Sequence, residues 1–480
     1  MLNRFLHPKS HEFTHYLVLA FFVIGIACSK ALMSIGIFLG LLNLILEGKF
    51  NEYWKSLKYS KSFWLISGLF FLHAIALFWT SNLTEGLDDL RMKTTLVTVP
   101  LIVFSKPDFV AQKRRSLLIL LILVVSLISL INVFAYFQVF GHREYLDMRQ
   151  LSLFGSHIRF SLLVAFSIGV SLFYYVESRK KYFLIVIIFL VFYTIFSQVF
   201  SGLVALLIVL MSLGLFYLKN KRLKLLGYAT IFIVFFSVSA IVVYILQPVE
   251  TKELAVNINQ LAEEWNKKSK LNFNGRDKKE QPLYSTIIRY LHSKDLSADS
   301  IGFSKLSEKD IREIENGTAD VHEKTPGFIG KLNEVRFQLH QTNDPNGSTI
   351  RQRIEFWKTG LEIIQENWLL GVGTGDIKFA FQKKYQENNS KLLPQNRLEA
   401  HNTFLTFFIT FGIIGLLYFL YFLYSGVFQL YASNNIIGLL FLLIMISSFM
   451  TEDTLETQMG ITIFSFLFSV LSIRQLNLHA

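Results

Sequence analysis

The sequence predicts an all-α polytopic membrane protein. Residues with apolar side chains make up 52% of the chain and charged residues only 17%, whereas a soluble domain carries about 25% charged residues. Many apolar stretches run without a charge for about 17–25 residues, which matches the roughly 30 Å hydrocarbon core of a bilayer. Because a backbone in lipid must satisfy its polar groups within its own segment, we expect these stretches to be helices.

We predict about twelve transmembrane helices. The first apolar stretch lacks a small-residue cleavage site and passes quickly into a second one, so we interpret it as a span and not as a cleaved leader. Tight turns at Ser29-Lys30 and Ser197-Gln198 separate spans that are almost continuous. The predicted spans are residues 14–29, 31–47, 62–80, 87–105, 116–140, 157–177, 181–197, 199–218, 225–246, 401–425, 433–450 and 457–473.

Basic residues gather in every second connection between these spans. Because Lys and Arg accumulate in cytoplasmic loops, these connections and both termini are predicted to be cytoplasmic. Residues 247–400 then form one large extracytoplasmic loop, between helices 1–9 in residues 1–246 and helices 10–12 in residues 401–480. The basic residues that carry this topology are Lys49, Lys55, Lys58, Lys61, Lys106, Lys113, Arg114, Arg115, Arg179, Lys180, Lys181, Lys219, Lys221, Arg222 and Lys224.

The formal net charge of +12 resides mainly outside the large loop, where acidic and basic residues are nearly equal in number. Topology therefore accounts for the basic balance, and no nucleic-acid partner is predicted. The single cysteine, Cys28, forms neither an internal disulfide nor a cysteine metal cluster.

The first part of the loop, about residues 250–345, is a polar insert. Residues 262–270 and 305–315 are predicted as exposed, charged helices. Residues 272–281 and 341–348 are predicted as turns or links.

The second part of the loop, about residues 349–387, is predicted to form amphipathic helices at the membrane interface. Apolar residues are spaced by 4, 3, 4, 3 and 4 positions from Ile350 to Trp368, which is one face of a helix. Two tryptophans on this face favour the headgroup level, and Ser348 is a candidate N-cap. The segment from Gly371 to Gly375 is predicted to end the helix as a turn.

His401 stands at the mouth of the tenth span. A histidine there is suited to act as a general base, because its unperturbed pKa lies near neutrality. The alternative is an interfacial histidine that only solvates the helix end.

Arg353 and Arg351 lie beside the apolar stripe, and Arg397 and Lys391 lie shortly before His401. Arginine in such a place binds a diphosphate through its bidentate fork, or else it faces water and lipid headgroups.

Arg159 and His157 fall near the start of the sixth span, where an ionisable residue is costly and often functional. Snorkelling of Arg159 to the interface is the alternative. Glu452, Asp453 and Glu456 cluster at the mouth of the last span and are interpreted as partners of these arginines or as acceptor-binding groups.

No metal or nucleotide site is predicted. The glycines from Gly371 to Gly375 follow no strand and precede no Gly-Lys-Ser/Thr, so they do not make a phosphate loop. No His, Asp and Glu residues have a metal-ligand spacing, and no Gly-x-Ser-x-Gly elbow is present.

Several late segments together resemble the O-antigen ligase and Wzy polymerase superfamily. The stretch from His401 to Gly415 is similar to the family's His-Asn pair followed by glycines in the next helix. Residues 353–357 and 367–375 resemble its Arg-x-x-x-Trp helix and Gly-Val-Gly turn, and residues 451–460 resemble the close of ligase-like members.

This resemblance implies a C-type glycosyltransferase fold in the bacterial inner (cytoplasmic) membrane. Such enzymes move a glycan from undecaprenyl diphosphate to a sugar hydroxyl of lipid A-core on the periplasmic face, without a metal or other cofactor. His401 matches the essential histidine of the family, and Arg353 matches an arginine that holds the diphosphate. The substrate-binding set is predicted to be Arg353, Arg159, Arg397, Arg351 and Asn402.

The chain departs from the family pattern in one middle span. Relatives often carry an arginine in a Ser-Arg-Gly-type segment, whereas residues 197–202 here read Ser-Gln-Val-Phe-Ser-Gly. Arg159 is a candidate to supply the missing charge.

Three other functions stay open at this stage. A Wzy-type polymerase uses the same donor but commonly has two sizeable loops, and a protein O-oligosaccharyltransferase uses Ser or Thr of a protein as acceptor. A flippase or transporter of lipid-linked oligosaccharide predicts charges in the middle of several spans and inverted repeats. The single late loop favours a ligase.

Overall fold

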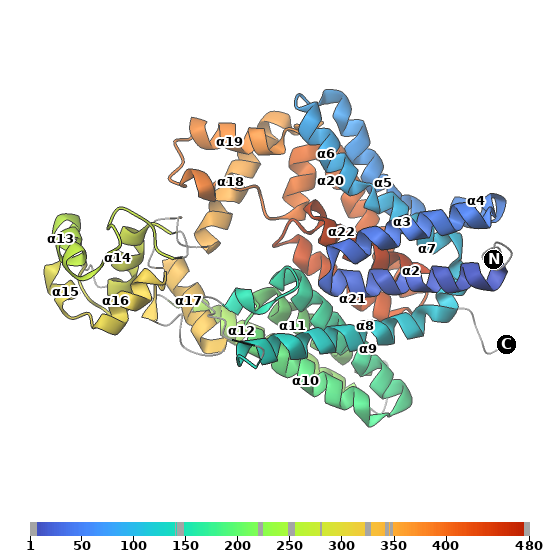
Figure 1. Ribbon diagram of the computed structural model, residues 1–480, viewed down its shortest axis with the longest axis horizontal. Coiled ribbons are helices and arrows are strands. Elements are labelled where there is room, and N and C mark those ends of the chain that lie inside the picture. The colour runs from blue at the N-terminus through green and yellow to red at the C-terminus, as the bar shows by residue number, and fades with distance from the viewer. Residues whose placement is uncertain are drawn as a thin grey trace. The chain divides into compact units, whose positions relative to one another are not determined.

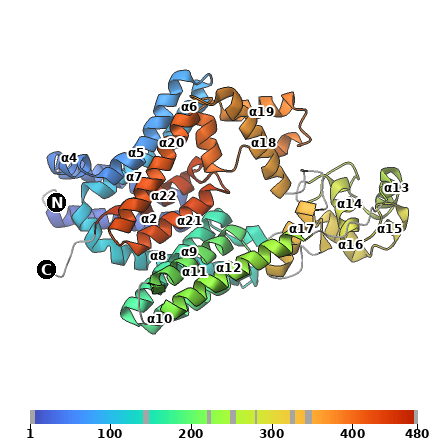
Figure 2. The same cartoon turned by 180° about the vertical axis from the view of Figure 1, so that it is seen from behind.

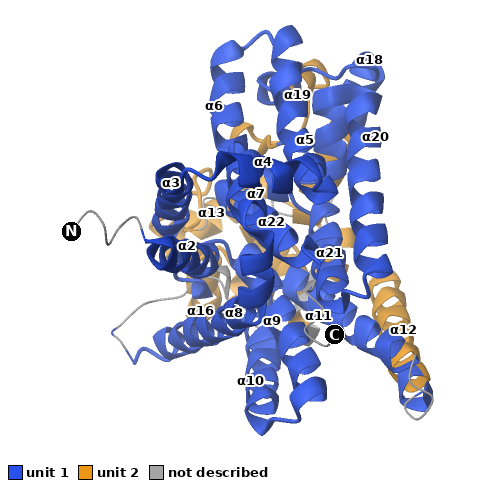
Figure 3. Ribbon diagram, turned by 90° about the vertical axis from the view of Figure 1, so that its right-hand side faces the viewer, with its two compact units in different colours: residues 1–227, 360–381, 399–480 blue, residues 228–359, 382–398 orange. Residues whose placement is uncertain are grey.

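The computed structural model describes residues 7–139, 141, 148–218, 224–247, 255–278, 281–321, 328–340, 345 and 349–474. The chain forms two compact units (Figure 3). Unit 1 comprises residues 1–227, 360–381 and 399–480, and unit 2 comprises residues 228–359 and 382–398. The positions of the units relative to one another are not determined.

Every regular element of the described residues is a helix, and only isolated β-bridges accompany them. The helices are seen from two sides in Figure 1 and Figure 2. The α-helices are α2 (Pro8–Cys28), α3 (Lys30–Glu47), α4 (Phe50–Lys58), α5 (Lys61–Ala76), α6 (Leu83–Lys93), α7 (Thr95–Ser105), α8 (Pro107–Tyr136), α9 (His157–Ser178), α10 (Lys181–Ser197), α11 (Phe200–Leu218), α12 (Lys224–Leu246), α13 (Ile258–Lys268), α14 (Leu283–Ser293), α15 (Ser300–Ser304), α16 (Glu308–Glu315), α17 (Phe328–His340), α18 (Thr349–Asn367), α19 (Ile377–Glu387), α20 (Thr403–Ala432), α21 (Ile436–Phe449) and α22 (Gln458–Ser472).

The all-α, multi-span class is confirmed. Eight described helices are long and apolar enough to cross a membrane, namely α2, α3, α5 with its 3-10 extension to Trp79, α8, α9, α11, α12 and α20. Three shorter apolar helices, α10, α21 and α22, cover three further predicted spans. The total of twelve spans and the one-loop topology stay predictions.

The predicted span 87–105 differs from the structure. It is divided into α6 and α7, and α6 carries Glu85, Asp88, Asp89, Arg91 and Lys93. Charged side chains on most of its turns give α6 a polar character that a lipid-facing helix does not have. The sequence pattern joined the polar α6 to the apolar α7 because no proline or glycine separates them.

Helix α22 lies inside unit 1. Nearly all of its side chains are buried, and it packs against α7, α21 and α2. An apolar helix that is buried on every side belongs to a protein core, not to a lipid-facing surface. The loop before α22, residues 450–457, is therefore held by a rigid element, and this loop carries the candidate site.

The polar insert is not the set of exposed helices that the sequence predicted. Helices α13, α14, α15 and α16 enclose a hydrophobic core of their own. Trp265 and Leu261 of α13 are fully buried, and so is Phe303 of α15. The predicted link at residues 341–344 and 346–348, with the candidate cap Ser348, lies outside the described residues, as do Lys219, Lys221 and Arg222 of the predicted basic connections.

Helix α18 forms over the predicted amphipathic stretch. Ile354 and Leu361 of the predicted stripe are exposed, as is Trp368, seven residues beyond Leu361 and just past the end of α18. Ile364 of the stripe is buried together with Phe356 and Ile363, so the stripe is exposed only in part. An exposed apolar line is what an interfacial helix presents to lipid, and the interfacial position stays a prediction.

Candidate active site

The candidate site of unit 1 gathers around the start of α20. Asn402 is the N-cap of this helix, and its side-chain oxygen accepts the backbone amide of Leu405 at 3.1 Å. Its side-chain amide donates to the Met450 carbonyl at 2.9 Å. The Asn402 side chain therefore caps α20 with its oxygen and ties the helix start to the loop after α21 with its amide. Its predicted contact with substrate stays a prediction.

Asp453 holds the residues at the head of α20 through its carboxylate. One oxygen accepts the backbone amide of His401 at 2.8 Å, and the other accepts that of Asn402 at 3.0 Å. The Thr406 hydroxyl donates to the second oxygen at 2.6 Å. A carboxylate at a helix N-terminus also interacts favourably with the helix dipole. Burial raises the pKa of Asp453, which the Thr406 hydrogen bond opposes.

His401 itself has an unusual backbone. Its φ is +47°, in the left-handed region that non-glycine residues rarely occupy. Such a conformation persists only where its surroundings over-determine it, and it occurs often at functional sites. Here Asp453 fixes the amide of His401, and the His401 side chain is half-buried at the end of an apolar helix.

A second ion network supports the same loop. The Lys93 side chain of α6 has no solvent exposure. Its ammonium lies 2.6 Å from a Glu456 carboxylate oxygen, donates to the Leu455 carbonyl at 2.6 Å and lies 3.7 Å from Asp89. Burial alone would raise the pKa of Glu456, but the Lys93 ammonium holds it below its ordinary value. Lys93 thus fixes residues 455 and 456, next to Asp453.

His73 of α5 extends this network into the span. Its Nε2 lies 3.9 Å from Asp89, and its Nδ1 lies 2.8 Å from the Leu69 carbonyl. The ring packs edge-on against Phe407 and Phe411 of α20, with centroid distances of 6.0 and 4.7 Å. No motif in the sequence points to His73, Asp89 and Lys93. Ionisable residues inside predicted spans were the available signal.

Glu399 adds another titratable group two residues before His401. Burial, followed by the charges of Glu456 and Asp453, raises the pKa of Glu399 to about 7. Lys378 is the cation that opposes this shift, and Asp89 adds to it. The carboxyl of Glu399 therefore exchanges its proton near neutral pH.

The glycine turn from Gly371 to Gly375 closes a break in α20. Gly412 has φ +62° and ψ −159° and interrupts the helix. The amides of Val372 and Gly373 donate to the carbonyls of Ile409 and Thr410, at 2.8 and 3.0 Å. The amide of Ile413 donates to the Trp368 carbonyl at 2.8 Å. A broken helix is tolerated at membrane depth only where other groups satisfy its backbone, and this turn does so.

Arg159 stands on the first turn of α9, within electrostatic reach of Glu452 and Asp453. Its Nε is buried and has no hydrogen-bond partner among the described residues. The same helical turn packs against residues 197–202, because the Ser161 hydroxyl lies 3.2 Å from that of Ser201. Arg159 is two residues before Ser161 and lies on another side of α9, so its replacement of the missing arginine stays a prediction.

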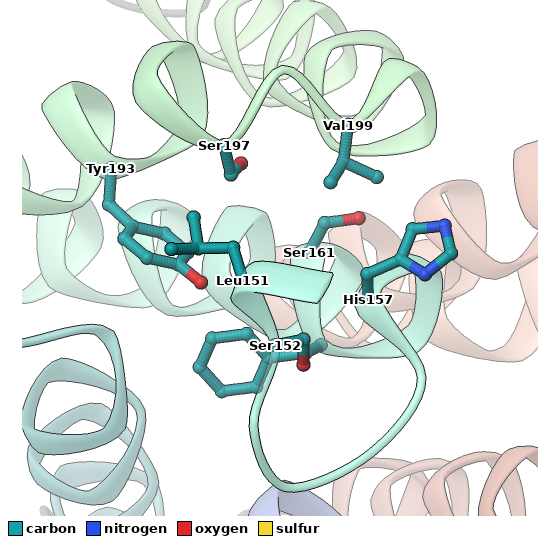
Figure 4. A pocket seen from close by; sticks show the side chains of 8 residues that line it. Leu151, Ser152, His157, Ser161, Tyr193, Ser197 and Val199 are labelled. Carbon is teal, nitrogen blue, oxygen red and sulfur yellow. The ribbon is translucent and has the colours of Figure 1, made fainter. Parts of the chain in front are cut away.

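A small pocket opens at this junction (Figure 4). Its polar groups are the hydroxyls of Ser152, Ser161, Tyr193 and Ser197 and the imidazole of His157. Asn132 donates to the Tyr193 hydroxyl at 2.9 Å, which fixes one wall. The lining residues are Leu151, Ser152, His157, Phe160, Ser161, Tyr193, Ser197 and Val199.

The other predicted arginines belong to unit 2. Arg351 donates to the Leu339 carbonyl at 2.7 Å. Arg397 donates to the carbonyls of Leu392 at 3.0 Å and Ser390 at 3.4 Å, so it braces its own loop. Since the placement of unit 2 relative to unit 1 is not determined, the joint action of Arg353, Arg351 and Arg397 with His401 stays a prediction.

Among the described residues, no group of three or more His, Cys, Asp or Glu side chains is arranged to hold a metal ion. Whether the reaction needs a metal is a separate matter, and metal independence stays a prediction.

The fold and the site define a multi-pass α-helical membrane protein with a histidine held at a helix end by a buried carboxylate. Residues 185–420 match a family described as O-antigen ligase. The chain belongs to the O-antigen ligase and Wzy polymerase superfamily. It is thus a membrane enzyme of the O-antigen ligase or polymerase type, and its family and apolar helices indicate a bacterial inner-membrane protein. No curated protein matches the chain.

Proposed function

We propose that this protein is an O-antigen ligase. It moves a glycan from undecaprenyl diphosphate to a sugar hydroxyl of lipid A-core on the periplasmic face of the inner membrane, and it needs no metal. The observation that carries the proposal is the hydrogen bond from the His401 amide to Asp453, which holds a half-buried histidine at the mouth of α20.

His401 acts as the general base in this proposal. The acceptor hydroxyl oxygen forms a bond to the anomeric carbon while the bond from that carbon to the diphosphate oxygen breaks. The electron pair leaves with the diphosphate, and the hydroxyl proton passes to the imidazole. A single displacement of this kind inverts the anomeric centre.

Arginines stabilise the leaving diphosphate. Charge-assisted hydrogen bonds to a growing negative charge are strongest in a site that excludes water. Arg159 is supported by its buried Nε, which has no hydrogen-bond partner among the described residues. Arg353, Arg351 and Arg397 are supported by sequence position and by the family resemblance. The interfacial face of α18 leaves the polyprenyl tail in lipid.

Acceptor identity separates ligase from polymerase. Deletion of the gene in its host, followed by lipopolysaccharide gel analysis, is expected to remove the whole O-antigen ladder while polymer accumulates on undecaprenyl diphosphate. A core that retains a single repeat unit would identify a polymerase and overturn the ligase proposal. An unchanged ladder with loss of glycan from an exported protein would identify a protein O-oligosaccharyltransferase.

His401 substitutions test the mechanism in the same strain. Asp453 accepts a hydrogen bond from the backbone amide of His401, so His401→Ala and His401→Gln retain that hydrogen bond. Both variants are expected to reach normal abundance and to lack transfer. Normal transfer by either would exclude His401 as the base.

The proposed orientation is tested by cysteine labelling. In a Cys28→Ser background, cysteine at the exposed position Asn274 is expected to react in intact spheroplasts with a maleimide that does not cross membranes. Cysteine at the exposed position Lys55 is expected to react only after the membrane is permeabilised. The reverse pattern would invert the topology.

A further inference from the structure

We propose that α4 and the start of α5 form a binding surface for the phosphate headgroups of anionic phospholipids. This α4 surface consists of Phe50, Trp54, Lys55, Lys58 and Lys61. It is formed by unit 1 alone and does not depend on the proposed transfer reaction.

Helix α4 packs against the rest of unit 1 along one side only. Tyr53 and Leu57, one helical turn apart, are buried, and α4 packs against α7 (Figure 1). Phe50, Trp54 and Lys58 follow each other at intervals of four residues, so they form the neighbouring ridge of the helix. This ridge and Lys55 are exposed. One face of the helix therefore remains open beside its anchored face.

The open ridge begins with large aromatic rings. The exposed fractions of Phe50 and Trp54 are 58% and 57%, and that of Tyr59, directly after α4, is 76%. Trp54 packs edge-on against Trp64 of α5, with ring centroids 6.4 Å apart. Aromatic residues, and tryptophan above all, favour the headgroup level of a bilayer, where the ring is half in lipid and half in water.

The acidic residues near α4 already have cationic partners. Glu47 pairs with Lys106 and accepts the Tyr53 hydroxyl at 2.7 Å. Glu52 lies 3.7 Å from Lys49.

Three lysines of the α4 surface have no acidic partner among the described residues. In the part of the chain that the structure describes, no carboxylate lies within ion-pair distance of Lys55, Lys58 or Lys61. The ammonium groups of Lys58 and Lys61 lie 5.6 and 5.8 Å from the ring centres of Tyr59 and Tyr421. The α4 surface thus carries three positive charges that no acidic side chain of the described residues neutralises.

The position of α4 between two candidate spans indicates which ligand the α4 surface binds. It connects α3, which ends at Glu47, to α5, which begins at Lys61, and both are candidate spans. A nine-residue helix between two spans stays at the membrane surface. A soluble anion would engage the lysines but would leave the aromatic ridge in water. An anionic lipid in the leaflet satisfies both, because polybasic segments attract acidic headgroups while rings insert beside the acyl chains.

The experiment compares lipids around the full-length protein in nanodiscs. Discs of phosphatidylcholine contain a minor fraction of brominated lipid, either phosphatidylglycerol or phosphatidylcholine. The quenching of Trp54 is obtained as the difference between the protein and its Trp54→Phe variant. We expect brominated phosphatidylglycerol to quench Trp54 about twofold more than brominated phosphatidylcholine, because lysines at the surface enrich acidic lipid.

The triple variant Lys55→Gln, Lys58→Gln, Lys61→Gln is expected to lose this preference and to retain quenching by phosphatidylcholine. The matched control changes Lys267, Lys268 and Lys270 of unit 2 to Gln, which removes the same charge elsewhere, and it is expected to keep the preference. Equal quenching by the two lipids in the unmodified protein would overturn the proposal. A preference that survives in the α4 triple variant, or that competes away with inorganic phosphate at constant ionic strength, would overturn it too.

Discussion

The carboxylate of Asp453 accepts the backbone amide of His401 at 2.8 Å, across 52 residues of sequence. This hydrogen bond joins the loop before the buried helix α22 to the head of α20. His401 has a left-handed backbone conformation, with φ +47°. Asp453 thereby fixes the backbone of the residue that we propose as the general base.

Asp453→Asn is expected to reduce transfer by about 10–100-fold, a typical loss when a supporting residue of a site is removed. The Asn side chain presents an NH2 group where one of the three donors now binds. Protein abundance is measured beside the lipopolysaccharide ladder, and Asp88→Asn, on the exposed side of α6, is the control. Transfer by Asp453→Asn at the level of that control would show that the carboxylate does not position His401.

Lys93 provides a test of the second network. Lys93→Met is expected to lower the free energy of unfolding by about 3–5 kcal/mol, because it leaves Glu456 buried without its cation. Lys93→Arg is expected to retain part of the stability, since it keeps the charge. The measurement is thermal unfolding of the purified protein in detergent.

A double-mutant cycle with Glu456→Gln separates pairing from packing. If Lys93 and Glu456 form one unit, the double variant is more stable than the sum of the single losses predicts. Additive losses would show that the 2.6 Å contact contributes no coupling.

Glu399 makes stability depend on pH in a specific direction. Its pKa is raised from 4.5 to about 7, so the folded state holds a proton that the unfolded state has released. The contribution of Glu399 to stability therefore falls as pH rises from 4.5 to 7 and is constant above that range. The full shift of its pKa corresponds to about 3 kcal/mol, and solvent screening of this partly exposed side chain reduces it, so Glu399→Gln is expected to be more stable than the unmodified protein at pH 8 by about 2 kcal/mol.

Below pH 4.5 the two proteins are expected to have equal unfolding temperatures. The exposed Glu12→Gln serves as the control, with no pH-dependent difference expected. A Glu399→Gln variant that is less stable at pH 8 than at pH 5, to the same degree as the unmodified protein, would assign the pH dependence to another group.

The sequence predicts the fold class well because lipid imposes a simple rule on every span. Long uncharged stretches became helices almost where expected, from α2 to α22. The exception is α6, where charges inside an apolar stretch belong to a buried network. Mean hydropathy is an average over such a stretch. It does not reveal that Lys93 forms an ion pair with Glu456, which lies hundreds of residues away in the sequence.

Motif spacing identified the region of His401 but not its supporting contacts. The sequence predicts Asp453, with Glu452 and Glu456, as a partner of arginines, and nothing local in the sequence shows that it accepts hydrogen bonds from the amides of His401 and Asn402. The core of the polar insert is hidden in the sequence for a related reason. Its apolar residues, such as Trp265 and Phe303, are sparse along the chain and come together only in three dimensions.

The break in α20 leads to a last prediction, about Gly412. Gly412 has φ +62° and ψ −159°, a backbone region that essentially only glycine occupies and that costs another residue about 1–3 kcal/mol. A Cβ at this position would also lie 2.2 Å from the Leu369 carbonyl oxygen. Gly412→Ala is therefore expected to push the 368–373 segment away from α20 and to expose the carbonyls of Ile409 and Thr410.

Gly48→Ala is the matched control, since Gly48 has φ +70° and open space around its Cβ position. Gly48 is in the ordinary left-handed region, with ψ 13°, so Gly48→Ala has a positive-φ cost without the steric collision. Gly412→Ala is expected to lower the unfolding temperature more than Gly48→Ala does and to reduce transfer, because α20 carries His401 at its head. Equal shifts for the two variants would mean that the turn does not brace α20, and the helix would then tolerate its break through other groups.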